Sequence, residues 1–274
     1  MRRLFVLIII IGMEGTSYAA HTLEPLGTEI GATPPRGRFF FQGVYTFLRT
    51  ENEEKINEHL LPLEIEFGLS ERTQLNLEGE VLIAEEEDGK VEERGIEEIA
   101  VGIKHRFFDE TKTLPDMAFE IEFAPVIELG DGLAIGGTLM FSKFLGRWFV
   151  LHINTGYEFE REEEKAEHGE EAEDEMEVAK EEGDETEITN VFFYNLALML
   201  RVIPDKFLLL AELNAEHRFV EDGPTIDEVV VVPEFIAVPF EKPLLALKLG
   251  VPIGLTDSSS TPDIGISAGI SWLF

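Results

Sequence analysis

Apolar and polar residues alternate along most of this chain, and this two-residue period constrains its fold more than any other feature. In residues 61–67, Leu-Pro-Leu-Glu-Ile-Glu-Phe, Glu64 and Glu66 face one way and the apolar side chains of the odd positions face the other. Residues 74–81, 119–123 and 210–216 repeat the scheme. A helix would scatter these carboxylates around its axis, because its period is 3.6 residues. The pattern therefore predicts an all-β fold.

Turn signals divide the chain into about twelve strands. We expect them at roughly residues 38–49, 58–68, 73–84, 96–107, 117–128, 133–144, 148–160, 189–202, 206–219, 228–239, 244–255 and 264–274. Mostly short connections alternate with polar, often long ones, as in an outer-membrane barrel with short periplasmic turns and long external loops. Most segments reach the ~9–11 residues that a tilted membrane-spanning strand needs. The expected fold is an antiparallel, up-and-down transmembrane β-barrel over residues 38–274.

The strand ends agree with this expectation. Aromatic residues gather near both ends of the expected strands, as girdles at the two membrane interfaces do. The last strand ends in Phe274 and resembles the signal by which bacterial outer-membrane barrels reach their assembly machinery. Pro125, Pro233 and Pro252 lie inside expected strands, so we expect bulges that absorb the missing N–H groups. The alternative is an exported soluble β-sandwich, whose strands would be shorter, about 5–6 residues.

The first twenty residues predict export. Two arginines precede an apolar run over residues 4–11, and a small-residue cleavage pattern follows at residues 17–19. This is the layout of a secretory signal peptide, and the run is too short to span ~30 Å of hydrocarbon. We therefore expect a signal peptide over residues 1–20, an N-terminal periplasmic segment over residues 21–37, and a barrel in the bacterial outer membrane.

In a membrane barrel the apolar face meets lipid and the polar face lines the lumen. The predicted pore-lining residues are Glu64, Glu66, Glu78, Glu80, Glu98, Lys104, Arg106, Glu120, Glu122, Glu212, Arg218 and Glu234, joined on the lumen face by Glu158, Glu160, Arg201, Glu216 and Lys248. Carboxylate rings in a pore favour cations. Because the acids outnumber the bases, we expect water or bound cations in part of the lumen. Twelve strands enclose a narrow lumen, so the sequence is consistent both with a water-filled pore and with a lumen filled by side chains.

The chain is strongly acidic, with 55 Asp and Glu against 22 Lys and Arg and a formal net charge of −33. Residues 158–187 hold 17 acids and three bases, which is nearly half of that charge. The external loop expected over residues 161–188 either collects cations, including divalent ions such as calcium or magnesium, or is a solvated charge run. A surface this acidic repels phosphate, which excludes a nucleic-acid partner.

No catalytic motif stands out. The chain has no cysteine, which excludes disulfides, thiolate zinc sites and a cysteine nucleophile. The GxSxG, HExxH and P-loop patterns are absent. His152 and Asn154 share the expected lumen face, and we expect no serine beside them. The sequence therefore predicts no enzyme, no catalytic residue, no defined metal site and no cofactor.

Two segments resemble a known family. Residues 67–77, Phe-Gly-Leu-Ser-Glu-Arg-Thr-Gln-Leu-Asn-Leu, and residues 95–107, Gly-Ile-Glu-Glu-Ile-Ala-Val-Gly-Ile-Lys-His-Arg-Phe, are similar to a hairpin and a strand of the outer-membrane proteins named for the MetA pathway of phenol degradation. The resemblance implies a channel-like outer-membrane barrel, and some members are linked to uptake of aromatic compounds. This chain departs from the family pattern where Glu97 and Glu98 replace the usual Gly-Asp, and in its acidic loop.

Three functions are consistent with the sequence. The leading one is a channel that passes small solutes, with cation preference set by lumen glutamates. The second is uptake of small aromatic or hydrophobic compounds, for which Phe40, Val44, Phe193 and Met199 at lumen positions are the support. The third is a non-conducting structural barrel whose acidic loops bind divalent cations. Outer-membrane lipid, the barrel assembly machinery and small solutes are the expected partners.

Overall fold

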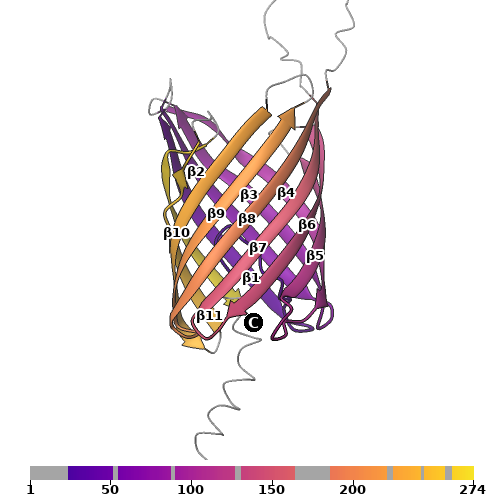
Figure 1. Ribbon diagram of the computed structural model, residues 1–274. Helices are drawn as coiled ribbons and strands as arrows, with labels where there is room; N and C mark the ends of the chain where they lie inside the picture. Colours follow the sequence, from indigo (N-terminus) through magenta and orange to yellow (C-terminus); the bar gives the residue numbers. More distant parts are fainter. Residues whose placement is uncertain are drawn as a thin grey trace, which may run out of the picture.

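The chain forms one closed antiparallel β-barrel of strongly tilted strands (Figure 1). The computed structural model describes residues 24–51, 55–87, 90–126, 131–163, 186–220, 225–241, 244–256 and 261–274. The strands are β1 (Phe39–Glu51), β2 (Lys55–Gly68), β3 (Thr73–Glu87), β4 (Lys90–Phe108), β5 (Asp116–Val126), β6 (Asp131–Leu145), β7 (Phe149–Glu163), β8 (Thr186–Ile203), β9 (Phe207–Val220), β10 (Thr225–Glu241), β11 (Leu244–Gly250), β12 (Ile253–Gly254) and β13 (Ile264–Leu273). Among the described residues, no helix is long and apolar enough to cross a membrane.

Twelve strands complete the ring, as expected. Each of β1 to β11 pairs with its neighbour in sequence order, and β13 pairs with β1 from Phe40↔Leu273 to Arg49↔Ile264. The two-residue β12 pairs with β10 and β13 and so continues the wall beyond β11. The predicted all-β, antiparallel barrel is confirmed.

One expected strand, residues 244–255, is interrupted in the structure. The break falls at Val251 and Pro252, between β11 and β12. Pro233 of β10 lies opposite, and its carbonyl oxygen accepts a hydrogen bond from Val251 N at 3.2 Å. Neither proline has an N–H to donate, so both are accommodated where the β10–β11 ladder is broken. Pro125 stays within β5, paired with Leu133 without a register shift, so the bulge expected there is absent.

The two ends of the barrel differ. We call the end at which β2 joins β3 the turn end, since turns at residues 69–72, 146–148 and 204–206 lie there, and the opposite end the loop end. At the loop end the acidic strand ends extend further than expected, because β7 continues to Glu163 and β8 begins at Thr186. Residues 164–185 of the expected 161–188 loop, like the expected signal peptide, lie outside the described residues.

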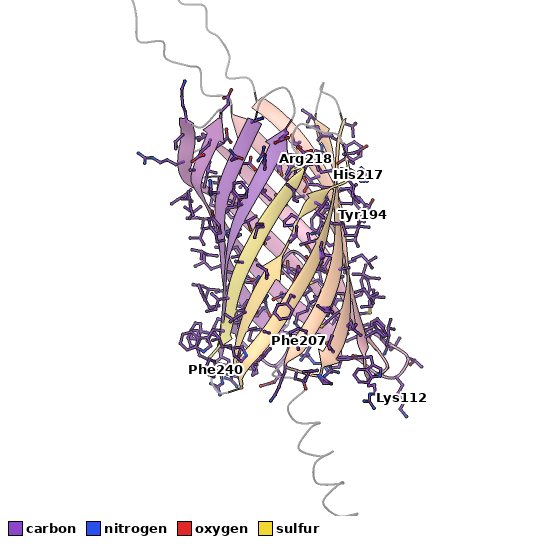
Figure 2. All side chains as sticks on the ribbon, turned by 90° about the vertical axis from the view of Figure 1, so that its left-hand side faces the viewer. Lys112, Tyr194, Phe207, His217, Arg218 and Phe240 are labelled. Carbon is purple, nitrogen blue, oxygen red and sulfur yellow. The ribbon has the colours of Figure 1, made fainter. Side chains whose placement is uncertain are left out.

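Alternation sorts the side chains as the sequence predicts. Ile65 is 40% exposed on the outer face, whereas Glu66 beside it is 0% exposed. Figure 2 shows Phe207 and Phe240 at the turn end and Tyr194 with His217 toward the loop end. The ring centroids of Phe207 and Phe235 lie 4.4 Å apart. The outer face is therefore an apolar band with aromatic residues near both ends, as in membrane-spanning barrels.

Candidate functional site

A segment of the chain lies inside the barrel. Residues 24–35, here called the inner segment, run within the lumen, and Glu24 and Ile30 are each 2% exposed. The sequence placed residues 21–37 in the periplasm, and for the described part of that range the structure corrects this expectation. The physical reason is hydrogen bonding, because the backbone of this irregular segment finds its acceptors on lumen side chains.

Three lumen side chains accept hydrogen bonds from backbone N–H groups of the inner segment. The N–H of Leu26 donates to Glu234 Oε1 at 3.0 Å, and those of Gly27 and Thr28 donate to the two carboxylate oxygens of Glu212 at 3.1 Å each. The N–H of Gly31 donates to Ser142 Oγ at 3.0 Å. Glu212 and Glu234 were predicted to line a pore, and in the structure they bind this segment.

The segment enters the lumen beside the turn that follows β2. Gly37 N donates to Gly68 O at 2.7 Å. A Cβ atom on Gly68 would lie only 2.3 Å from Pro35 O and 2.5 Å from Pro34 O. Glycine is therefore the one residue that lets the two backbones approach this closely. Further inside, the Leu26 side chain packs where a Cβ on Gly250 would stand.

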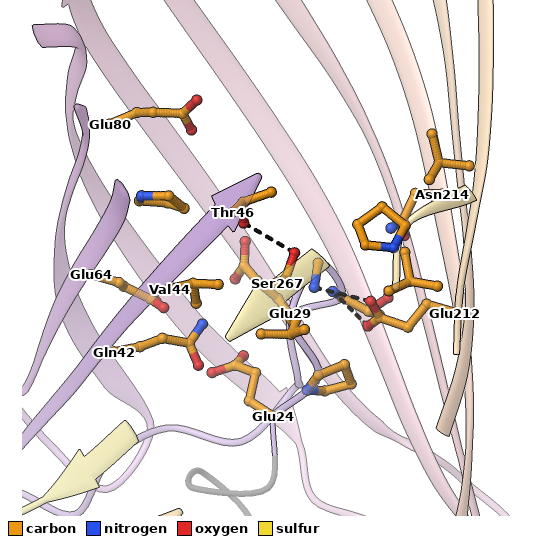
Figure 3. Close-up of a pocket in the computed structure, with 18 of the residues that line it drawn as sticks. Glu24, Glu29, Gln42, Val44, Thr46, Glu64, Glu80, Glu212, Asn214 and Ser267 are labelled. Carbon is orange, nitrogen blue, oxygen red and sulfur yellow. Dashed lines mark hydrogen bonds between the residues drawn. The ribbon is translucent and has the colours of Figure 1, made fainter. Parts of the chain in front are cut away.

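Above the inner segment, on its loop-end side, the lumen is hollow (Figure 3). The cavity measures about 560 Å³. The described residues that line it include eight glutamates and no lysine or arginine. The glutamates are Glu24, Glu29, Glu64, Glu78, Glu80, Glu98, Glu212 and Glu228. In Figure 3, Glu24 and Glu29 stand between Glu64 on one wall and Glu212 on the other.

The predicted pore-lining residues divide into three groups. Glu64, Glu78, Glu80, Glu98 and Glu212 line the cavity. Glu66, Lys104, Glu120, Glu122 and Glu234 belong to the polar packing around the inner segment. Arg106 and Arg218 lie near opposite ends, where Arg106 Nη2 donates to Glu71 O at 2.7 Å and Arg218 pairs with Glu160 at 3.2 Å. Neither arginine therefore lines the cavity.

A buried polar network surrounds Lys104. Its Nζ lies 3.2 Å from Glu66 Oε1 and 3.1 Å from Glu29 Oε2 of the inner segment. Gln74 donates to Glu66 and, at 2.7 Å, to Asn76 Oδ1, and Asn76 Nδ2 donates to Glu120. Gln74 and Asn76 were not among the predicted pore-lining residues, although their alternation with Leu75 and Leu77 places them on the lumen face.

The lumen also holds two clusters of three carboxylates. In each, one oxygen per residue lies within 4.8 Å of the other two. The members are Glu24, Glu64 and Glu66 in one cluster and Glu78, Glu120 and Glu122 in the other. Carboxylate oxygens at such spacing are the ligands of hard cations.

One expectation about catalysis is wrong. Ser142 of β6 lies directly across from His152 of β7, and its Oγ is 2.8 Å from His152 Nδ1. The sequence had predicted no serine beside His152, because the strand register that brings the two together was not known. His152 is 6% exposed, and Ser142 Oγ already accepts the Gly31 N–H, so the inner segment covers this pair.

The fold is similar to that of solved outer-membrane proteins. The COG4313 outer membrane channel from Pseudomonas putida F1 superposes with a TM-score of 0.63 at 11% identity, covering 92% of this chain and 100% of its own. The NanC porin gives 0.53 at 8% identity, over 85% and 98% of the two chains. The β-domain of the Bordetella autotransporter Brka gives 0.54 at 11% identity, over 88% and 100%.

The chain is an outer-membrane-type β-barrel. No family model matches its sequence, and no curated protein matches it. The solved structures thus support the barrel fold that the resemblance implied, and its assignment to the phenol-degradation family has no support from sequence comparison.

Proposed function

We propose that this protein is a narrow outer-membrane channel for small solutes that prefers cations. The observation that carries the proposal is the cavity of about 560 Å³, which is lined by eight glutamates and by no lysine or arginine. Fixed carboxylates around a water-filled space raise the local concentration of cations and repel anions. The COG4313 channel and the NanC porin, which have the same fold, are a channel and a porin by name.

The inner segment sets how narrow the path is. It is bound to the wall on both sides, by Glu212 and Glu234 and by Lys104, so we expect ions to pass between the segment and the wall. We therefore expect small single-channel conductance, with the glutamate cavity at the loop end as the selective part. In the membrane, the turn end faces the periplasm and the loop end faces outward.

Conductance in planar bilayers tests the proposal. The refolded mature chain should give steady channels whose reversal potential under a KCl gradient is on the cation-selective side. Glu80 and Glu98 face each other across β3 and β4 and both line the cavity. We expect the double variant Glu80→Gln/Glu98→Gln to shift the reversal potential toward zero, because two groups that can carry negative charge beside the permeating ion are lost.

The matched control is Glu71→Gln, which removes one carboxylate from an exposed turn outside the lumen. Its reversal potential should equal that of the wild type. An unselective or anion-selective wild-type channel would refute the cation preference, and inserted protein without current would favour the structural-barrel alternative.

Uptake of small apolar compounds is the second candidate, and one observation favours it. Val150, Met199, Leu208, Leu210, Ile236, Val238 and Ala246 form a buried apolar cluster on the lumen side of β7 to β11. Met199 was among the lumen residues that supported this alternative. The cluster is closely packed, at 0–6% exposure, so it offers no open path in this conformation. Faster swelling of proteoliposomes in small aromatic solutes than in sugars of equal size would favour this candidate.

A further inference from the structure

Four glutamates meet in the lumen beneath the cavity. Oxygen atoms of Glu78 on β3 and of Glu120 and Glu122 on β5 all lie within 4.8 Å of one another. Glu29 of the inner segment adjoins them, since its side chain contacts that of Glu120 and pairs with Lys104. Lys104 lies beside them and pairs with Glu29 itself at 3.1 Å and with Glu66 at 3.2 Å, whereas among the described residues Glu78, Glu120 and Glu122 form no ion pair. If all four carboxyl groups are ionised, the cluster carries more negative charge than the one ammonium of Lys104 balances.

The surroundings of one carboxylate in this cluster, Glu120, indicate that a ligand binds there. Glu120 is 2% exposed, its side chain contacts that of Glu29, and no amide, hydroxyl or ammonium group donates to its buried Oε2. Its Oε1 accepts a hydrogen bond from Asn76 Nδ2, and Gln74 in turn orients Asn76. The Glu120 carboxylate is thus held in one orientation beside Glu78 and Glu122. A buried carboxylate oxygen that no donor reaches is unfavourable unless a cation or a proton meets it.

We propose that Glu78, Glu120 and Glu122, together with Glu29, bind one calcium ion. Calcium takes six to eight oxygen ligands at about 2.3–2.6 Å, so ligands on opposite sides of the ion lie about 5 Å apart. Oxygen separations within 4.8 Å fit that sphere, and calcium tolerates an irregular set of carboxylates, whereas magnesium demands near-ideal octahedral geometry and keeps several of its waters. Glu29 and Glu78 also line the cavity, where water has room to complete the coordination.

The position of the site gives the ion a structural role. Glu29 belongs to the inner segment, and the other three ligands belong to the wall. A bound ion therefore ties the segment to β3 and β5, in addition to the hydrogen bonds that Glu212 and Glu234 make. The inference does not depend on ion conduction, since a non-conducting barrel could hold the same ion.

Calorimetric titration of the refolded mature chain with CaCl₂ tests the proposal, in detergent with 0.15 M KCl. We expect one calcium ion per chain, at least tenfold weaker binding in Glu120→Gln and in Glu122→Gln, and unchanged binding in Glu71→Gln. Equal affinity in Glu120→Gln and the wild type would overturn the proposal. So would loss of the site on deletion of residues 164–185, or magnesium binding as tight as calcium binding.

Thermal unfolding provides a second measurement that separates a cation from a shared proton. In EGTA, Glu120→Gln should be at least as stable as the wild type, because one of several repelling carboxylates becomes neutral. With calcium, the unfolding temperature of the wild type should rise and that of the variant should not. If a shared proton relieves the repulsion, calcium shifts neither protein and the proposal fails. Glu122→Gln gives the same comparison if Glu120→Gln does not fold.

Discussion

At the residue scale, one absent methyl group decides whether the inner segment can enter the barrel. Gly68 ends β2 where the chain of Pro34 and Pro35 crosses it, and a Cβ there would overlap two carbonyl oxygens. Backbone atoms cannot rotate away as a side chain can. The glycine is therefore a steric requirement of the entry point, and not only a feature of the turn that follows.

Gly68→Ala should consequently destabilise the folded protein. Overpacking of this kind costs about 1–3 kcal/mol, and the inner segment is the part that has to shift. The measurement is the midpoint of thermal or urea unfolding in detergent. Gly79→Ala is the matched control, since a Cβ at Gly79 meets only Glu98 O at 3.6 Å, an ordinary contact. If the unfolding midpoints of both variants equal that of the wild type, the close approach at Gly68 is not a real constraint.

Single residues also show what can be predicted from sequence. The placement of Glu66 inside and Ile65 outside follows from the two-residue period, because a strand turns successive side chains to opposite faces. The Ser142–His152 pair could not be predicted in the same way. It depends on the register between β6 and β7, which is set by pairing along the whole hairpin rather than by either residue.

At the scale of elements, the barrel wall was predictable and the inner segment was not. Each wall strand carries its own signal, since lipid on one side and lumen on the other impose alternation. Residues 24–35 have no such period, and the N–H groups of three of them donate to Glu212 and Glu234, about two hundred residues away. Nothing local in the segment indicates these partners, so the sequence predicted only an N-terminal periplasmic segment over residues 21–37.

The hold of Glu212 on the segment can be tested with a cysteine probe, because the chain has no cysteine of its own. Thr28 is 1% exposed, so Thr28→Cys should resist labelling by a maleimide in the folded barrel. Adding Glu212→Ala removes the acceptor of two backbone N–H groups, each worth about 1–3 kcal/mol when left buried and unsatisfied. Labelling should then become fast.

The companion variant is Glu212→Gln, whose side-chain carbonyl keeps one acceptor and should give intermediate labelling. Fast labelling of Thr28→Cys without any change at Glu212 would mean that the segment does not stay in the lumen.

At the scale of the whole molecule, charge is distributed unevenly along the barrel axis. The lumen cavity is acidic, the strand ends at the loop end carry further glutamates, and residues 158–187 add 17 acids. Fields from exposed charges extend over a Debye length, about 10 Å at 0.1 M salt and about 3 Å at 1 M. The loop and the cavity should therefore respond differently to ionic strength.

Deleting residues 164–185 should lower cation selectivity at low salt and leave it unchanged in 1 M KCl. The reason is that the loop acts through a screened field, whereas the cavity glutamates lie beside the permeating ion. Reversal potentials at both salt concentrations, for the deletion and the wild type, provide the measurement. An unchanged potential in dilute salt would show that the run of acids only keeps the loop soluble.

The inner segment also bears on the order of barrel assembly. Residues 26–28 come early in the chain, yet their acceptors lie on β9 and β10, which are among the last strands. The N–H groups of Leu26, Gly27 and Thr28 have no Glu212 or Glu234 acceptor until β9 and β10 stand opposite them. A part of the chain that is made early can thus settle only once two strands that are made late are in place, and an intermediate without β9 and β10 would leave its interior unsealed.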